Sequence, residues 1–288
     1  MSNVTPLTDL IDSNLVIVAG KGGVGKTTVT AVLARAAADA GLHVLVVELD
    51  GKSTLATLVP DLTVRHISAA DALEEYLFEH GFRRIAKRLA STGVIDVIST
   101  AAPGINDLVV LGKIKQLERS GEWDLIIVDG PAAGHAVTFL TSAAGLLDAI
   151  RGGPIRSQAE DVQAMLSDPK RCRVLLVALP ETTPINELIE TARAVETRVG
   201  ARLGSIIVNQ VDPQALLPDP ASVDFGRATV SVVEAVAAAD FRRQRQVAQS
   251  DELRRLADSV PAQQIHLDRV LTARLSPADV TELAQAIR

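Results

Sequence analysis

The sequence predicts an α/β fold with a mostly parallel central sheet flanked by helices. Two observations indicate this class. Five short runs are apolar almost throughout, without the alternation of a half-exposed strand, and helical patterns separate them. The runs are LVIVA, VLVVE, LIIVD, VLLVAL and SIIVN. Strands that alternate with helices join into a parallel sheet through right-handed crossovers.

The predicted helices carry apolar stripes and recognisable ends. Residues 29–40 repeat apolar side chains at helical spacing. A second helix is predicted over 182–199, with Thr183 as its cap and Pro184 in its first turn. The segment LSPADVTELAQAI shows a similar Ser-Pro start nearer the C-terminus.

Two regions depart from this alternation. Residues 69–121 look mainly helical around an ambiguous VIDVIST, and residues 136–171 resemble two short helices broken at GGP. We expect both to be helical insertions at one edge of a single domain that spans residues 1–288.

The apolar faces of these insertions leave two interpretations open. They form a groove for a client, or they pack on the core of their own domain. The first face comprises Leu73, Leu77, Phe78, Phe82, Ile85 and Leu89, and the second Phe139, Leu140, Ala143, Leu146, Leu147 and Ile150.

Composition excludes several classes of protein. Of 288 residues 47% are apolar and 2% aromatic, and the formal net charge is −6. A nucleic-acid partner is not expected, because such binding uses a basic footprint and aromatic stacking platforms. No stretch approaches the roughly 18 apolar residues of a membrane span, and no secretory signal is recognisable. With Cys172 as the single cysteine, a cytoplasmic protein without an integral membrane segment is expected.

The segment GKGGVGKTTV directly follows the first predicted strand and matches G-x-x-x-x-G-K-[ST]. In such a loop, backbone N–H groups bind phosphate at a helix N-terminus. The Lys26 side chain would reach the β- and γ-phosphates, and the Thr27 hydroxyl would ligate Mg²⁺. The sequence therefore predicts a site for ATP and Mg²⁺. Its phosphate-binding residues are Gly22, Gly23, Val24, Gly25, Lys26, Thr27 and Thr28.

Two aspartates end predicted strands, and ligand groups gather at the carboxyl ends of the strands in an open α/β sheet. Asp129 is predicted to hold Mg²⁺ through water, and Asp50 to orient the attacking water. Helix caps after a strand are the alternative for both. Gly130 and Gly134 are predicted to allow a nucleotide-dependent switch.

Six segments taken together resemble the arsenite-pump and tail-anchored-protein-targeting ATPase family. They are GKGGVGKTT, ELDGKSTL, STAAPGINDL, VDGPAAGHAVTFL, ALPETTPINE and IIVNQ. The resemblance covers nearly the whole chain, in the family's order. The segment DGKS replaces the family's usual Asp-Pro-Ala-His and is similar to the short actinobacterial anion-transporting-ATPase-like members.

The resemblance implies an ATPase with a deviant Walker A loop that dimerises around nucleotide. Lys21 would cross to the partner's nucleotide as a catalytic cation, with a solvated loop lysine as the alternative. Asn209 would contact adenine. The implied partners are a second copy or a paralogous ATPase subunit, together with a protein or hydrophobic client.

This chain also departs from the family. One cysteine cannot supply the three thiolates of an arsenite site. No Cys-x-x-Cys pair is present, so zinc is not expected. Met165 is the only internal methionine, so a methionine-rich client groove is reduced or absent.

Two other function classes stay open. One is a spatial regulator like the partitioning ATPases, for which FRRQRQ would contribute to a basic patch on DNA, whereas the acidic tail disfavours membrane positioning. The other is a biosynthetic P-loop ligase, whose ATP turnover would depend on a small carboxylic acid.

Overall fold

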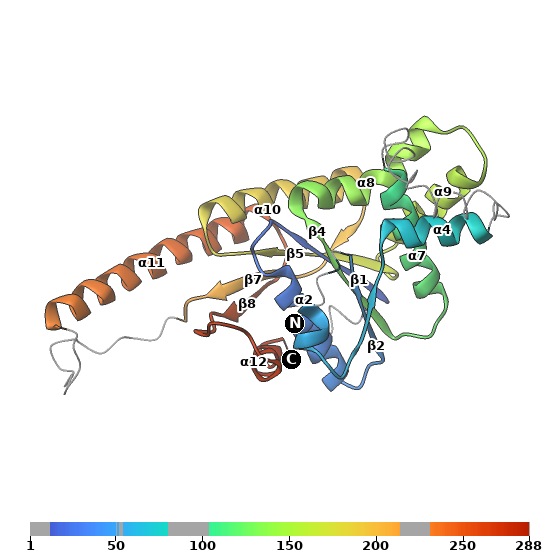
Figure 1. The fold of residues 1–288 in the computed structure, drawn as a ribbon. Helices are drawn as coiled ribbons and strands as arrows, with labels where there is room; N and C mark the ends of the chain where they lie inside the picture. The colour runs from blue at the N-terminus through green and yellow to red at the C-terminus, as the bar shows by residue number, and fades with distance from the viewer. Residues whose placement is uncertain (1–11, 50, 52–53, 80–103, 214–230, 288) are drawn as a thin grey trace.

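The computed structural model describes residues 12–49, 51, 54–79, 104–213 and 231–287. At its centre lies an eight-stranded sheet of order β3-β2-β4-β1-β5-β7-β8, with β6 paired to β5 (Figure 1). Every pair is parallel, so the predicted fold class is confirmed. The strands are β1 (Leu15–Gly20), β2 (Val44–Glu48), β3 (Thr63–His66), β4 (Leu125–Ala132), β5 (Cys172–Ala178), β6 (Arg202–Leu203), β7 (Ile206–Val211) and β8 (Gln264–Asp268).

The five apolar runs coincide with β1, β2, β4, β5 and β7, which occupy the middle of the sheet. All residues of β1, β2 and β5 are buried, which is why these runs show no alternation. The edge strands β3 and β8 escaped the sequence analysis. Only Ile265 and Leu267 of β8 are buried, so its apolar signal is weak.

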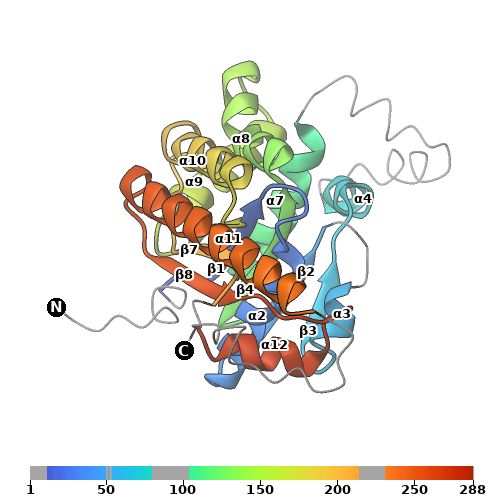
Figure 2. The same cartoon turned by 90° about the vertical axis from the view of Figure 1, so that its left-hand side faces the viewer.

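Helices cover both faces of the sheet (Figures 1 and 2). On one face α2 and α12 share a core with β1, β2 and β4. On the other face α7, α8 and α10 share a larger core. The helices are α2 (Lys26–Asp39), α3 (Thr54–Leu58), α4 (Ala69–Glu79), α7 (Ile105–Arg119), α8 (Ala133–Ala149), α9 (Pro154–Ser167), α10 (Thr182–Ala194) with a π-helical turn η1 (Val195–Val199), α11 (Val232–Ser259) and α12 (Pro277–Ala284).

The predicted helix starts are right in one case and wrong in another. Ser276 caps α12 in a capping box with Asp279, as the Ser-Pro start predicts. The prediction of Thr183 as the cap of α10 is wrong, because the helix begins at Thr182 with Glu181 as its N-cap. A proline is tolerated at any position of the first turn, where backbone N–H groups have no intrahelical acceptor. Pro184 was therefore compatible with more than one first residue of α10.

The helices α4, α7, α8 and α9 form one packed group, in which α7 contacts the other three and α8 contacts α9. Phe139 and Leu140 lie in the core, as do Ala143, Leu146 and Leu73. These side chains therefore pack on the core of their own domain and do not line a groove for a client. Phe82, Ile85 and Leu89 lie outside the described residues.

Candidate functional site

The loop between β1 and α2 depends on two glycines. Gly25 is the N-cap of α2 and has left-handed dihedral angles, φ 88° and ψ 32°. A Cβ there would lie 2.3 Å from the Asn209 Nδ2 atom, and a Cβ at Gly20 would lie 2.3 Å from the Val177 carbonyl oxygen. The start of α2, which is described in full, has no side-chain cap and no acidic residue in its first turn. This end of the helix suits an anion, because its N–H groups and dipole favour negative charge.

Asp129 lies beside this loop and is 8% exposed. The Thr27 hydroxyl donates to its Oδ2 atom at 2.7 Å, and the Thr30 hydroxyl to its Oδ1 atom at 3.5 Å. The strand places Asp129 next to Val18 of β1 and Glu48 of β2. It does not end its strand as expected, because β4 continues to Ala132. In these two hydrogen bonds the Asp129 carboxylate accepts from hydroxyl groups and caps no helix, so they do not support the alternative of Asp129 as a helix cap.

Thr30 is a residue of this cluster that the sequence analysis missed. It follows Thr27 by three positions, so both hydroxyls lie on one face of α2. That spacing was a usable signal. Thr30 is fully buried, and its hydroxyl helps to hold the carboxylate in one orientation.

The pair of Thr27 and Asp129 fits the magnesium ion that the loop motif implies. Hydroxyl and carboxylate oxygens are the ligands that Mg²⁺ prefers, and the ion usually keeps several waters and substrate phosphates in its shell. In the part of the chain that the structure describes, no group of three or more His, Cys, Asp or Glu side chains forms a metal cluster. A site in which Thr27 would hold the ion directly and Asp129 through water, completed by phosphate and further waters, needs no such cluster.

The two lysines of the loop make different contacts. Lys26 Nζ donates to the Lys21 carbonyl oxygen at 3.3 Å, inside the curve of the loop. Lys21 Nζ pairs with Glu187 Oε1 of α10 at 2.5 Å, with both side chains more than one-third exposed. Such a pair contributes on the order of 1 kcal/mol or less. Lys21 is therefore paired within its own chain, although the pair stabilises the fold little. In the single chain it is not the solvated loop lysine of the alternative interpretation.

Glu187 is a second residue that the sequence analysis missed. It lies 166 positions after Lys21, within α10 and at the end of the segment ALPETTPINE. Only the crossover that places α10 after β5, next to β1, brings the two together. The segment ALPETTPINE was singled out for its resemblance to the family, but nothing local in it indicates a contact with Lys21.

Asn209 lies at an irregular point of β7. The register with β8 shifts between Val208 and Val211, and Gln210 has φ 58°, the only positive value among the described non-glycine residues. A bulge of this kind re-aims a side chain. The Asn209 amide is buried and donates from Nδ2 to the Val24 carbonyl oxygen at 2.9 Å. The structure thus places Asn209 against the loop.

The segment that follows β2 is seen only in part, because Asp50 lies outside the described residues. Next to it, Gly51 has φ 65°, and a Cβ there would lie 3.2 Å from the His66 ring. The His66 Nδ1 atom donates to the Glu48 carbonyl oxygen at 3.0 Å. His66 of β3 therefore packs against the chain on both sides of Asp50.

Gly130 has a structural role in addition to the predicted switch. A Cβ at this position would lie 2.4 Å from the Val18 carbonyl oxygen. The absence of a side chain lets β4 approach β1 closely beside Asp129.

The remaining special side chains are buried away from the loop. Cys172 begins β5, and burial raises the pKa of its thiol to about 12. Met165 is likewise fully buried. Neither presents sulfur to a ligand.

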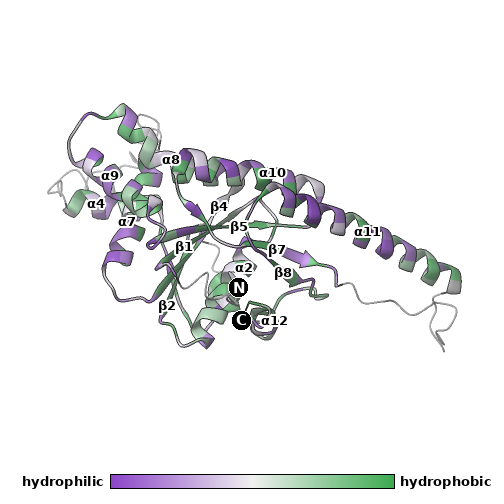
Figure 3. Cartoon of the chain, turned by 180° about the vertical axis from the view of Figure 1, so that it is seen from behind, coloured by the Kyte–Doolittle hydropathy of each residue, from purple (hydrophilic) through white to green (hydrophobic). Residues whose placement is uncertain are grey.

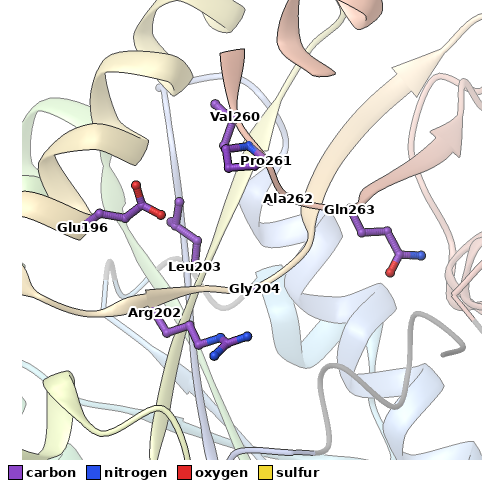
Figure 4. Close-up of a pocket in the computed structure, with 8 residues that line it drawn as sticks. All are labelled: Glu196, Arg202, Leu203, Gly204, Val260, Pro261, Ala262 and Gln263. Carbon is purple, nitrogen blue, oxygen red and sulfur yellow. The ribbon is translucent and has the colours of Figure 1, made fainter. Parts of the chain in front are cut away.

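A cavity of about 550 Å³ opens at the opposite edge of the sheet (Figure 4). Its wall comes from η1, from the segment of β6 and from the turn before β8, where the strands begin. The phosphate loop lies where the strands end, so this cavity is separate from the candidate site. Its lining residues are Glu196, Arg202, Leu203, Gly204, Val260, Pro261, Ala262 and Gln263.

Comparison with known proteins identifies the family of this chain. Residues 15–222 match the model of the CobQ/CobB/MinD/ParA nucleotide binding domain. ATPase BagA of Mycobacterium tuberculosis is 31% identical over 244 residues, which cover 76% of this chain and 70% of BagA. An arsenical pump-driving ATPase of Escherichia coli is 28% identical over 204 residues, and one of Acidiphilium multivorum is 29% identical over 205 residues.

The arsenical pump-driving ATPases are much longer than this chain, which matches 35% of their length and 69% of its own. None of the described helices is both long and apolar enough to span a membrane. The prediction of an ATPase is confirmed in that the domain is a P-loop nucleotide-binding domain whose relatives are named ATPases. From the matched model and the relatives, the chain belongs to the CobQ/CobB/MinD/ParA nucleotide-binding domain family and, within it, to the arsenite-pump ATPase-like proteins with actinobacterial members.

Proposed function

We propose that this chain is a Mg²⁺-dependent ATP-hydrolysing switch that dimerises around nucleotide and couples ATP binding and hydrolysis to a protein or hydrophobic client. The observation that carries the proposal is the Thr27 hydroxyl at 2.7 Å from Asp129, beside an α2 N-terminus that no side chain caps. This pair is what a magnesium–triphosphate site needs from the protein.

The chain's own residues divide the work of hydrolysis between them. The backbone N–H groups of residues 22–28 bind phosphate oxygens, and Lys26 neutralises the β- and γ-phosphates. Thr27 would hold Mg²⁺ directly and Asp129 would hold it through water. When bound, the ion neutralises charge that develops on the phosphate oxygens. Asp50 orients the attacking water, and Asn209 Oδ1 accepts a hydrogen bond from the adenine amino group.

Lys21 supplies its cation to the partner's nucleotide. In the single chain it is held by Glu187, and this exposed pair is weak enough to exchange for a triphosphate. Two chains that meet at their loop edges would each complete the other's site. Hydrolysis would then remove the charge that keeps the lysines in place and let the dimer change shape.

The test is ATP turnover measured together with oligomeric state. We expect Mg²⁺-dependent hydrolysis, and a dimer in sedimentation velocity with Mg²⁺ and a non-hydrolysable ATP analogue. Lys21→Ala should slow turnover with little change in ADP affinity of the monomer, and Asp50→Asn should bind ATP but hydrolyse it slowly. Normal turnover by Lys21→Ala would show that the proposed role in trans is wrong.

A spatial regulator is the second candidate, because the family model also describes MinD and ParA. The predicted basic patch is weaker than its sequence suggests. Arg242 pairs with Asp212 at 2.7 Å, and Arg243 with Asp240 at 3.2 Å. A salt-dependent mobility shift of duplex DNA that requires ATP would favour this candidate over the client-binding switch.

A further inference from the structure

The helix α11 leaves the body of the protein at the same edge as the phosphate loop. Its hydrogen bonds to other elements include Arg242 to Asp212 at 2.7 Å and Gln246 to the Pro213 carbonyl oxygen at 2.9 Å. Asp212 directly follows β7, so these contacts mark where α11 passes the carboxyl edge of the sheet. The ten residues 232–241 precede them and extend about 15 Å further, at 1.5 Å per residue (Figure 1).

This projecting part forms a helix with little help from the body. Ser231 and Glu234 make a full capping box at its start, with the Glu234 carboxylate accepting from the Ser231 N–H at 2.8 Å. Alanines at 235 and 237–239 give high helix propensity. The sequence thus stabilises a helix that reaches past the sheet.

Most of the exposed large hydrophobic residues of the described part of the chain lie on this helix. Figure 3 shows hydrophobic and hydrophilic positions mixed along its length. Single exposed apolar residues are ordinary, but several of them along one helix indicate an interaction surface. Val236 and Val247 share one face of this helix, whereas Phe241 lies on another. The members on α11 are Val233 at 78% exposed, Val236 at 38%, Phe241 at 63% and Val247 at 62%.

Four positions of α11 form one outward face, which we call the α11 seam: Val236, Asp240, Arg243 and Val247. Their spacings of four, three and four residues keep them within about 60° of the helix circumference. The body lies on the opposite side, where Arg242 contacts Asp212. Within one chain Asp240 and Arg243 pair with each other at 3.2 Å in an exposed geometry.

The seam is complementary to itself in the antiparallel orientation. When the twofold axis passes between residues 241 and 242, Val236 faces Val247 of the other helix, and Asp240 faces Arg243. Each of these contacts then occurs twice, with ion pairs at the centre and apolar contacts outside them. A parallel arrangement would instead place Asp240 against Asp240 and Arg243 against Arg243, which is repulsive.

We propose that a second copy of this chain docks on the α11 seam, with the two α11 helices antiparallel. The inference rests on the proposed function, since it takes the nucleotide-dependent dimer as given and names a second contact in it. Because α11 projects from the edge that carries the loop, this contact forms on the side from which the partner approaches. With the α11 helices in contact, the phosphate loop of each chain would be held near that of the other, which raises their effective concentration.

Site-specific cross-linking tests the orientation. Full chains carrying Val236→Cys and Val247→Cys are mixed with Mg²⁺ and a non-hydrolysable ATP analogue under mild oxidation. We expect a disulfide-linked dimer in the mixture, and none with Val236→Cys alone. In the antiparallel pair, two copies of position 236 lie eleven residues or about 16 Å apart along the axis, beyond the reach of a disulfide. The native Cys172 is fully buried and does not compete.

Charge exchange tests the pairing itself. Asp240→Arg or Arg243→Asp alone should weaken dimerisation about tenfold, because each change creates like-charge contacts across the seam. The double variant D240R/R243D should restore it. The matched control is Arg254→Asp, which breaks the similar exposed pair of Asp251 and Arg254 on the same helix but lies beyond residue 251, where the overlap ends. Equal behaviour of the control and the two single variants would overturn the proposal.

The outcomes separate this inference from the proposed function. Sedimentation of the same samples reports whether a dimer forms at all, and ATP turnover of the cysteine variants reports whether the site works. A nucleotide-dependent dimer without the mixed disulfide contradicts the α11 contact alone. A Val236→Cys homodimer contradicts the antiparallel orientation. No dimer under any condition contradicts both proposals.

Discussion

The phosphate loop and the projecting end of α11 leave the sheet at the same edge, but the sequence specifies them in different ways. The loop is determined by close backbone approach, since a side chain at Gly20 or Gly25 would collide with β5 or with Asn209. The end of α11 is determined by its own helix propensity and cap, with few contacts to the body. The nucleotide site can therefore be recognised as a local sequence motif. The interaction surface consists of side chains that α11 leaves exposed, and no motif marks it.

The largest predicted effect concerns the loop. Lys26→Ala should reduce ATP turnover by about 10³-fold or more, because Lys21, the other lysine of the loop, pairs with Glu187 and does not replace the charge of Lys26 on the β- and γ-phosphates of the same chain. Steady-state phosphate release measures it. Lys170→Ala is the control, since this exposed lysine lies before β5 and far from the loop in sequence. Equal loss in both variants would mean that the effect is not specific to the loop.

The next effect concerns the packing of strands beneath the loop. Gly130→Ala should lower the free energy of unfolding by about 2–4 kcal/mol, because its Cβ would press on the Val18 carbonyl oxygen. Urea denaturation followed by circular dichroism measures the change.

Gly145 provides the matched control for that substitution. It lies within α8, and a Cβ added there would meet no heavy atom within 4 Å, so Gly145→Ala should raise stability by up to about 1 kcal/mol. If both variants lost stability alike, close approach of β4 and β1 would not be the reason that residue 130 is glycine.

A smaller effect concerns Cys172, which pairs in register with Leu15 at the start of β1. Burial raises the pKa of this thiol from 9.0 to about 12. Between these values the unfolded chain loses the proton and the folded chain keeps it. Stability should therefore fall as pH rises above 9, by about 1 kcal/mol per pH unit. Cys172→Ala, although less stable overall, should lack this part of the slope in unfolding experiments from pH 8 to 10.5; an identical slope in both proteins would contradict the burial argument.

The smallest effect concerns the anchor of α11. Arg242 holds the helix to Asp212, and the same ion pair lowers the pKa of the Asp212 carboxyl. Arg242→Ala should speed amide hydrogen exchange across residues 232–246 in the nucleotide-free protein, with the global stability almost unchanged. Arg254→Ala, which removes a pair confined to the helix, should leave that exchange as it is. Equal exchange in the two variants would show that Asp212 is not the anchor.

The sequence predicted the central strands and the loop because their signals are local. Apolar runs mark strands buried on both faces, and the glycine loop fixes its own geometry. Edge strand β8 and helix α11 were missed for one reason: their side chains are half exposed or polar, so burial leaves no periodic apolar pattern. Glu187 and the bulge at Gln210 were missed for another reason. They depend on crossovers and on strand register, which are properties of the folded chain as a whole.

Subunit complementation tests the central claim, a lysine shared between two sites, most directly. The variants Lys21→Ala and Lys26→Ala are each expected to hydrolyse ATP poorly. If Lys21 acts on the partner's nucleotide, a mixture of the two should recover turnover. In a mixed dimer the Lys21→Ala chain keeps its own Lys26 and receives Lys21 from its partner, which gives one complete site. If Lys21 acted within its own chain, no mixed dimer would hold a complete site, and the mixture would stay as slow as its components.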